Sequence, residues 1–174
     1  MTSHSPERRA AAVAPPRLTE EEIDQLLSMT LIANLATIDR AGTIHVVPIW
    51  YRHEPPHILM PTSRLTQKYR NLQRNPRASV MVDLSRAGLD LRGVLVRGTV
   101  RIVEGAEAKR LNRSIHLRYV TAEGLRQPEV SRYLSEGDDV TLMLSMDKLV
   151  SWNNSASPSG RALLQSRNHQ PLGV

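Results

Sequence analysis

The sequence predicts a mainly β fold, a small antiparallel β-barrel with a few flanking helices. Six segments have strand character, a tight turn joins the first two, and the helical segments between the others are brief. Strands joined by hairpin turns favour an antiparallel barrel over alternating parallel units, because parallel strands need long crossovers. At 174 residues the chain has the size of one domain. We therefore expect one folded unit at residues 18–152.

The six expected strands are runs rich in aliphatic and β-branched residues, bounded by turn residues. The sequence DRAG separates the first two and predicts a hairpin. Gly98 lies inside the longest run. A glycine within a strand marks a bulge or a tight bend, as at the corner of a barrel. The expected strands are residues 31–38, 43–51, 57–61, 78–84, 92–104 and 139–152.

Helices are expected beside this sheet. Thr19 followed by Glu22 forms a capping box that predicts a helix over residues 19–28. Apolar residues at helical spacing predict another helix within residues 104–120, and a short one is expected at 128–135. The stripe of the longer helix is Ala108, Leu111, Ile115 and Tyr119.

The two ends of the chain lack apolar periodicity. Residues 1–17 are rich in Ala, Pro, Ser and Arg, so a disordered tail is expected there. Residues 153–174 are polar, and we expect an irregular tail. Neither a signal-peptide apolar region nor an apolar run of about 20 residues occurs, so we expect a cytoplasmic protein without contact to a membrane.

The composition excludes several classes of site. The chain has no cysteine, so disulfides, thiolate metal sites and cysteine nucleophiles are excluded. No metal-ligand spacing, paired carboxylate motif or Ser-His-Asp pattern is recognised, so no metal is expected. The net charge of +6 comes mainly from arginine. A nucleic-acid partner ranks low, because phenylalanine is absent, other aromatic residues are few and no nucleic-acid motif is present.

The segment PTSRLTQKYRNLQRNP, residues 61–76, is the strongest indication of chemistry. Leu65, Tyr69 and Leu72 follow helical spacing, and Thr62 or Ser63 is expected to cap the helix. Hydroxyl groups, free backbone N–H groups and the positive end of the helix dipole would then meet just after a strand. Arg64 and Lys68 add positive charge. This pattern indicates either a phosphate site or a solvated cationic helix face.

Four motifs in order resemble the flavin-binding split-barrel proteins related to pyridoxamine 5′-phosphate oxidase. They are LIANLATIDRAG, HVVPIWY, PTSRLTQKYRNLQRNPRASVMVD and LRGVLVRGTVRIVE. The resemblance implies a six-stranded split barrel, a homodimer with a cofactor at its interface, and hydride transfer between that cofactor and a small organic substrate. The alternatives are an FMN enzyme like pyridoxamine-phosphate oxidase itself, or a non-catalytic flavin- or haem-binding protein of the same fold.

The resemblance also implies which residues hold the cofactor. Residues after the third expected strand would bind the phosphate, and the second expected strand would run along the ring of the cofactor. Trp152 would either cover that ring from the partner protomer or anchor the barrel. Leu72 is expected in the core. The implied cofactor-binding residues are Val47, Pro48, Ile49, Trp50, Thr62, Ser63, Lys68, Arg70, Asn71 and Trp152.

The identity of the cofactor and the catalytic residues stay open at this stage. The deazaflavin coenzyme F420 has a long acidic tail, and the nearby cations favour it narrowly over FMN. His45 and His116 are either substrate contacts or structural residues, and solvent, Tyr119 or a histidine would supply a proton. The substrate and the direction of the reaction are undetermined. The cations near the expected phosphate site are Arg64, Arg70, Arg74 and Arg77.

Overall fold

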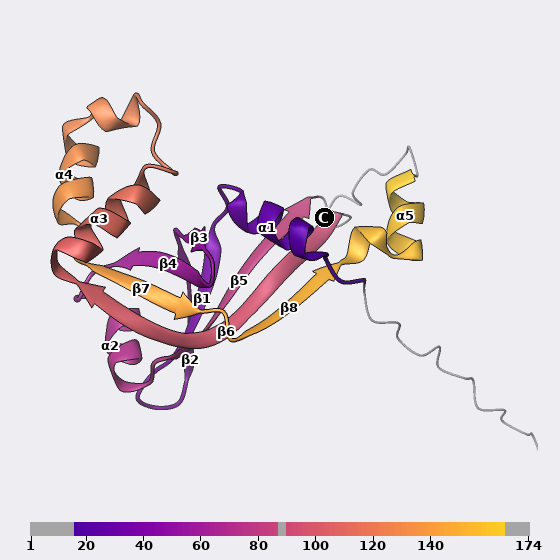
Figure 1. Cartoon of the computed structure of the whole chain (residues 1–174), viewed down its shortest axis with the longest axis horizontal. Coiled ribbons are helices and arrows are strands. Elements are labelled where there is room, and N and C mark those ends of the chain that lie inside the picture. Colours follow the sequence, from indigo (N-terminus) through magenta and orange to yellow (C-terminus); the bar gives the residue numbers. More distant parts are fainter. Residues whose placement is uncertain (1–15, 87–89, 166–174) are drawn as a thin grey trace, which may run out of the picture.

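The computed structural model describes residues 16–86 and 90–165, which form an antiparallel sheet with flanking helices (Figure 1). The strands run in the order β2-β1-β5-β6-β7-β4-β3, and β8 pairs with β6. This is the predicted split barrel, and it is not closed, because the path ends at β2 and β3. Its strands are β1 (Ala33–Ile38), β2 (Ile44–Ile49), β3 (Arg52–Glu54), β4 (His57–Thr62), β5 (Arg77–Arg86), β6 (Asp90–Glu104), β7 (Val140–Ser145) and β8 (Lys148–Asn153).

The described residues contain eight strands instead of the six predicted. The expected strand at 139–152 is two strands, since the chain leaves the sheet at Met146 and Asp147 and β8 then pairs with β6 and not with β4. The short β3 pairs with β4 and was not anticipated. Only Met146 and Asp147 separate β7 from β8, and no glycine or proline lies between them, which is why the break was not visible in the sequence.

The first hairpin forms as predicted. The Asp39 carboxylate accepts hydrogen bonds from the backbone N–H groups of Ala41 (2.8 Å) and Thr43 (2.9 Å). Gly42 adopts a φ of +84°, a conformation that side chains disfavour. Strand β2 lies at the end of the sheet path, which agrees with Pro48, since proline cannot donate to a further strand. The turn therefore fixes the register between β1 and β2. The other edge of β2 has no neighbouring strand in the described sheet.

Near Gly98, strand β6 changes its pairing partner from β8 to β7. Residues Arg92–Arg97 pair with β8, and Val100–Glu104 pair with β7. A Cβ atom at Gly98 would lie 1.8 Å from the carbonyl oxygen of Ser145. The predicted bend is thus confirmed as a close approach of two backbones that only glycine permits.

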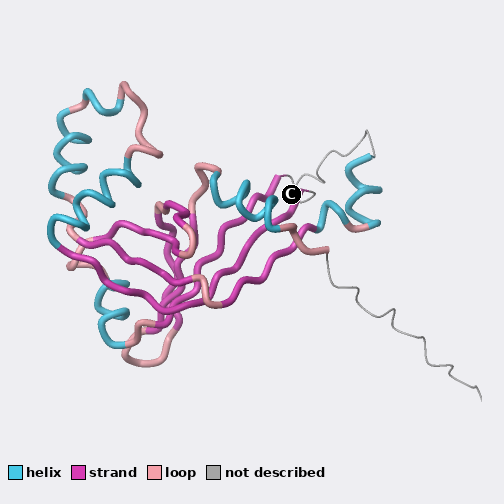
Figure 2. The backbone as a smooth tube through the Cα atoms, viewed as in Figure 1, coloured by secondary structure: helices cyan, strands magenta, loops and turns pink. Residues whose placement is uncertain are grey.

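Helix α1 (Glu20–Ser28) covers the main core. Its capping box is present, with the backbone N–H of Glu22 donating to Thr19 Oγ1 (3.2 Å) and that of Thr19 donating to the Glu22 carboxylate (2.8 Å). Leu26 and Leu27 are buried against β-strand residues such as Leu35. Figure 2 shows this helix lying across the strands. The predicted capping box and the helix that follows it are therefore confirmed.

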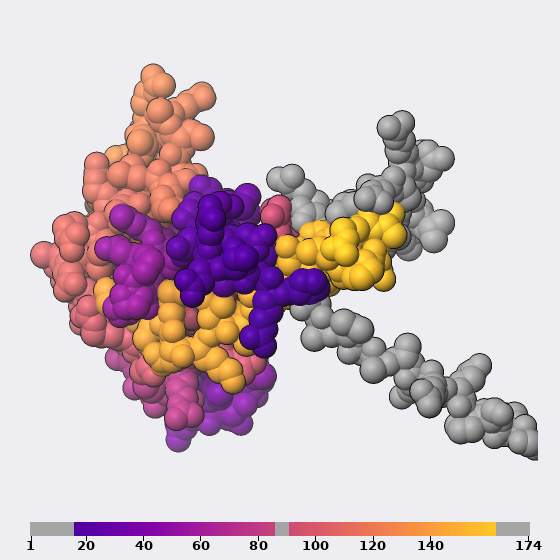
Figure 3. All heavy atoms as spheres, turned by 45° about the vertical axis from the view of Figure 1, so that its right-hand side comes forward, coloured from indigo at the N-terminus to yellow at the C-terminus, as the bar shows by residue number. Residues whose placement is uncertain are grey.

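Two further helices lie at the other end of the molecule. The predicted helices are confirmed as α3 (Gly105–His116) and α4 (Pro128–Glu136), with the single-turn helix η1 (Gly124–Arg126) between them. Ala108, Leu111 and Ile115 form a second core cluster with the sheet, as their spacing predicted. Helix α4 buries none of its residues, and the segment that contains it projects from the body (Figure 3, orange).

The C-terminal part differs from the irregular tail that was expected. After β8 the chain forms the turn η2 (Asn154–Ala156) and then helix α5 (Pro158–Gln165). The Asn153 side chain caps η2 by accepting a hydrogen bond from the Ala156 N–H (3.3 Å). Proline at the first position of α5 then favours the start of a helix. The other expected tail falls mostly on residues 1–15, outside the described part. No helix of the described chain is long and apolar enough to cross a membrane.

Candidate functional site

Helix α2 (Gln67–Arg74) begins later than the sequence indicated. Its N-cap is Thr66, whose Oγ1 accepts a hydrogen bond from the Tyr69 N–H (3.4 Å). Leu65 precedes the helix and is 84% exposed, so it is not part of the apolar stripe as predicted. Tyr69 and Leu72 are buried, as expected. Thr66 therefore takes the capping role that was predicted for Thr62 or Ser63.

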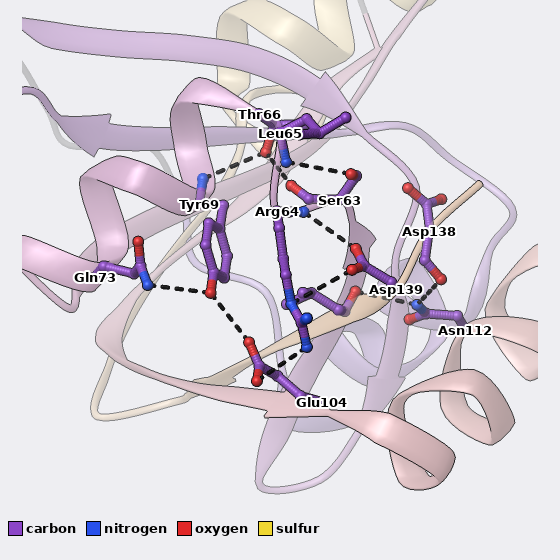
Figure 4. Close-up of polar contacts among 11 residues, drawn as sticks. Ser63, Arg64, Leu65, Thr66, Tyr69, Gln73, Glu104, Asn112, Asp138 and Asp139 are labelled. Carbon is purple, nitrogen blue, oxygen red and sulfur yellow. Dashed lines mark hydrogen bonds and ion pairs between the residues drawn. The ribbon is translucent and has the colours of Figure 1, made fainter. Parts of the chain in front are cut away.

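The loop before α2 is held by Arg64 (Figure 4). Its guanidinium pairs with Glu104 (3.1 Å) and Asp139 (3.4 Å), and its backbone N–H donates to the Asp139 carboxylate (3.1 Å). The hydroxyl of Tyr69 donates to Glu104 (3.0 Å), which ties the helix to the same acid. Arg64 is thus paired with acidic groups of this chain and positions the loop.

A cleft of about 470 Å³ opens at the start of α2. It brings together the end of β2, the end of β4, the first turn of α2 and the segment around the end of α4. Thr62 Oγ1 donates to Thr66 Oγ1 (3.0 Å), because the Thr66 hydroxyl itself donates to the Ser63 carbonyl (2.8 Å). The lining residues are Ile32, Pro48, Ile49, Trp50, Pro61, Thr62, Thr66, Lys68, Tyr133 and Asp138.

Lys68 is the cation of this cleft. Within the described chain its ammonium group makes no hydrogen bond or ion pair. Burial lowers the pKa of Lys68, and the negative charge of Asp138 partly opposes this effect. A half-buried ammonium without a partner is costly. An anion entering the cleft would therefore gain from Lys68 and from the free N–H groups at the start of α2.

Asp138 accepts two hydrogen bonds on one oxygen, from His116 Nε2 (3.0 Å) and from the Tyr133 hydroxyl (2.8 Å). We call these three residues the Asp138 cluster. Burial alone would raise the pKa of Asp138, but the bonds from His116 and Tyr133 and the charge of Lys68 leave it below its usual value. Burial, followed by the bond to Asp138, raises the pKa of Tyr133 to about 12. The carboxylate is therefore ionised and Tyr133 is neutral at neutral pH.

Asp138→Asn is expected to destabilise the protein at pH 7 more than at pH 3. The folded protein holds the Asp138 pKa below the value of about 3.9 in the unfolded chain. The stabilisation from its carboxylate is thus present above pH 4 and is lost as the pH falls below it. Urea unfolding of both proteins at the two pH values measures this, with Asp147→Asn, at an exposed position, as the control. A loss that is equal at both pH values would contradict the assignment.

Five predicted cofactor residues lie in the cleft and five do not. Pro48, Ile49, Trp50, Thr62 and Lys68 line it. Asn71 is fully buried, and its amide donates to Thr37 (3.0 Å) and accepts from Gln67 (2.7 Å) and Arg74 (3.1 Å). Arg70 folds back on the carbonyl of Leu65 (3.1 Å) and the side chain of Gln67 (3.1 Å). The others outside the cleft are Val47, Ser63 and Trp152.

Trp152 lies on β8 and packs across Gly93 of β6. A Cβ atom at Gly93 would lie 2.4 Å from the Trp152 ring. This contact supports the anchoring role, one of the two that the sequence left open.

Two of the three residues considered for substrate contact or proton supply, Tyr119 and His116, have structural partners. The Tyr119 hydroxyl donates to the carbonyl of Leu31 (2.7 Å) and accepts from the N–H of Tyr51 (3.1 Å), so it is not placed to supply a proton. His116 is buried within the Asp138 cluster. His45 lies on β2, outside the cleft.

Five cleft residues were not predicted from the sequence: Ile32, Pro61, Thr66, Tyr133 and Asp138. Thr66 is of a residue type that often caps helices, but the helix was predicted to include Leu65 and therefore to begin before Thr66. Tyr133 and Asp138 come from a segment without a recognisable motif. Only the fold brings them to Lys68.

Comparisons with known proteins agree with this architecture. A family model described as pyridoxamine 5′-phosphate oxidase matches residues 19–145. The chain is similar to the conserved hypothetical protein Rv2991 from Mycobacterium tuberculosis, with 27% identity and a TM-score of 0.67 over 90% of this chain and 93% of that one. It is similar to a solved F420 reductase, with 27% identity and a TM-score of 0.57 over 76% and 98% of the two chains.

A more distant likeness is to HutZ, the haem storage protein from Vibrio cholerae, with 17% identity and a TM-score of 0.59 over 75% of this chain and 92% of that one. At this identity the likeness concerns the fold alone. A search of the curated proteins finds no match to the sequence.

Proposed function

Because the chain belongs to the pyridoxamine 5′-phosphate oxidase family, we propose that it is an oxidoreductase that binds a phosphorylated flavin or deazaflavin in the cleft around Lys68. The observation that carries this proposal is the unpaired, half-buried ammonium of Lys68 beside the first turn of α2. The same cleft contains the free edge of β2 at Pro48–Trp50. A phosphate group and a flat ring system thus have matching partners in one cavity.

The residues of the cleft have distinct tasks in this proposal. Lys68 and the free N–H groups of the first turn of α2 hold the phosphate. The backbone at Pro48 and Ile49 and the indole of Trp50 lie against the ring and exclude water from one side. The bound cofactor supplies hydride transfer to or from a small organic substrate.

Two observations bear on the choice between FMN and coenzyme F420. The solved F420 reductase, at 27% identity, favours the deazaflavin. The arginines that the sequence offered for its acidic tail have other partners, since Arg64 pairs with two acids and Arg74 donates to Asn71. Arg77 lines a different groove, beside Ile38 and Ile44. We propose coenzyme F420 on the strength of the similar reductase, with FMN as the alternative.

We further propose that the protein acts as a homodimer. The edge strand β2 exposes Ile44 (69%) and Val46 (56%), and Ile38 on β1 is 40% exposed. Aliphatic side chains on a sheet edge favour coverage by another chain. Sedimentation equilibrium checks the proposal: a mass of two chains is expected, and a monomer at micromolar concentration would contradict it.

Titration with FMN and with F420, followed by cofactor fluorescence, tests the function. We expect saturable binding of one of them and oxidation of the bound, reduced cofactor when quinones or enones are added. Binding without turnover by any acceptor would indicate a carrier protein. Binding of haem in place of both cofactors would overturn the proposal.

A further inference from the structure

Two charged side chains of opposite sign line the cleft around Lys68. Lys68 and Asp138 are the charged residues among the lining residues that the structure describes. The arginines nearest in sequence are engaged elsewhere, because Arg64 pairs with two acids and Arg70 donates to the carbonyl of Leu65. An anion that enters the cleft therefore meets one cation and one carboxylate.

The Asp138 carboxylate keeps its negative charge although it is hydrogen-bonded. Both of its donors, the Tyr133 hydroxyl (2.8 Å) and His116 Nε2 (3.0 Å), bind the oxygen Oδ2. His116 is 1% exposed, and within the described chain its Nδ1 has no hydrogen-bond partner. A protonated imidazole would leave a charged N–H group buried and unpaired, so the neutral ring is favoured. The donors of the Asp138 cluster thus stabilise the carboxylate without cancelling its charge.

The position of this carboxylate is fixed from the backbone as well. The carbonyl of Asp138 accepts a hydrogen bond from the side-chain amide of Asn112 (3.1 Å), which Figure 4 shows. The same amide group donates to the carbonyl of Val140 (3.1 Å), at the start of β7. Turning the carboxylate away from the cleft would break its hydrogen bonds with His116 and Tyr133. Asp138 is therefore a permanent negative charge in the wall.

Phosphate esters differ in the charge that they would bring into this cleft. A phosphomonoester has a second pKa of about 6 and carries nearly two negative charges at pH 8, whereas a phosphodiester carries one. The cleft is roughly 8 Å across, judged from its volume of about 470 Å³, and physiological salt screens charges over about 8 Å. A phosphate held in the cleft is therefore within the field of Asp138.

The two negative charges of a monoester would not be met equally. The first is balanced by Lys68 and by the positive end of the α2 dipole. The second finds no further cation among the described lining residues, and it faces Asp138. Removing a second charge from water without a partner is unfavourable. The arrangement consequently favours a singly charged phosphate.

We propose that Asp138 determines which phosphate the cleft accepts, favouring a singly charged phosphodiester over a doubly charged phosphomonoester. The inference rests on the proposed function, since it concerns the phosphate of the same cofactor. FMN is a phosphomonoester. Coenzyme F420 is a phosphodiester, because its phosphate also carries the acidic tail. Asp138 thus favours F420 for a reason that does not depend on the arginines around α2.

The singly charged methyl ester of FMN, riboflavin 5′-(methyl phosphate), tests this inference against FMN in fluorescence titrations at pH 8. The 5′-phosphate of the deazaflavin chromophore and its methyl ester form a second pair. In the pair that it binds, the unchanged protein is expected to bind the methyl ester at least fivefold more tightly than the monoester. Asp138→Asn is expected to lower this ratio to twofold or less. Because both ligands meet the same protein, a change in the ratio does not reflect a general loss of stability.

Glu136→Gln is the matched control. It removes a negative charge two residues away, at an exposed position that does not line the cleft. Its ratio of affinities is expected to stay within twofold of the ratio in the unchanged protein. The comparison of the two esters in the unchanged protein needs no variant, so it tests the inference even if Asp138→Asn does not fold.

The possible results distinguish this inference from the proposed function. A monoester that binds the unchanged protein as tightly as its methyl ester would overturn the role of Asp138 alone. A preference that Asp138→Asn retains, or that Glu136→Gln also removes, would do the same. Binding of F420 without binding of any of the four esters would assign recognition to the acidic tail and also overturn that role. Failure of all these ligands to bind would overturn the proposed function, and the inference with it.

Discussion

Replacing Lys68 by methionine is expected to weaken binding of FMN or coenzyme F420 by about 10- to 100-fold. A hydrogen bond to a charged group contributes about 1.5 to 3 kcal/mol, and about 1.4 kcal/mol corresponds to a factor of ten in affinity. Lys68 is the cation that lines the described cleft, and its ammonium has no other partner there. Fluorescence titration of the variant and of the unchanged protein measures the difference.

Arg70→Met is the matched control, since it removes a cation two residues away that folds back on Leu65 and Gln67. Its cofactor affinity is expected to stay within about threefold of the unchanged protein. If Arg70→Met reduced affinity as much as Lys68→Met, the effect would come from the general charge of α2, and the discrete phosphate site would be wrong. Thermal unfolding of both variants shows whether either substitution disturbs the fold.

Gly98→Ala is expected to have the largest effect on stability, a loss of about 3 kcal/mol or more. The added methyl group would overlap the carbonyl of Ser145, a backbone group at the end of β7. The two strands must separate locally, so the cost lies at the upper end of overpacking, about 1–3 kcal/mol. Urea unfolding monitored by far-UV circular dichroism gives the change in the free energy of unfolding.

Thr99→Ala provides the comparison for this variant. Thr99 follows Gly98 on β6 and is exposed. Its substitution is expected to change the free energy of unfolding by less than about 1 kcal/mol, as is usual for surface positions. A Gly98→Ala protein as stable as Thr99→Ala would show that the strands do not approach as closely as the structure has them.

Much of the fold was predictable because its elements carry local patterns. The capping box at Thr19, the DRAG turn, the interior Gly98 and the stripe of α3 each have a direct physical cause in nearby residues. The break between β7 and β8 had no such pattern, because only Met146 and Asp147 separate the two strands and neither is a glycine or a proline. Helix α5 was missed for a different reason: it is short, it lies in a segment that is polar overall, and the proline that starts it was expected to belong to a tail.

The site was predictable where a helix start follows a strand, and less so elsewhere. Lys68 and Thr62, which were predicted to bind the cofactor, line the cleft, but Thr66 was overlooked because Leu65 was assigned to the helix. The interpretation of the arginines as a strip for an acidic tail did not anticipate that Glu104 and Asp139 pair with Arg64. Such pairs join residues far apart in the chain, so composition alone cannot reveal them.

The Asp138 cluster illustrates the same limit. His116 was considered only as a substrate contact or as a structural residue, and Tyr133 and Asp138 were not considered. Their meeting depends on the register of α3 and α4 against β7, which brings the ring nitrogen and the phenol hydroxyl to one carboxylate oxygen. This arrangement places Tyr133 in the wall of the cleft around Lys68.

The central claim is that the cleft around Lys68 holds the phosphate of a flavin-type cofactor. Parallel calorimetric titrations with FMN and riboflavin, and with F420 and its dephosphorylated chromophore, test it most directly, because each pair differs by the phosphate-bearing part. The phosphorylated member of one pair is predicted to bind at least tenfold more tightly, and Lys68→Met is predicted to remove most of that advantage. Equal affinities within both pairs in the unchanged protein would contradict the account.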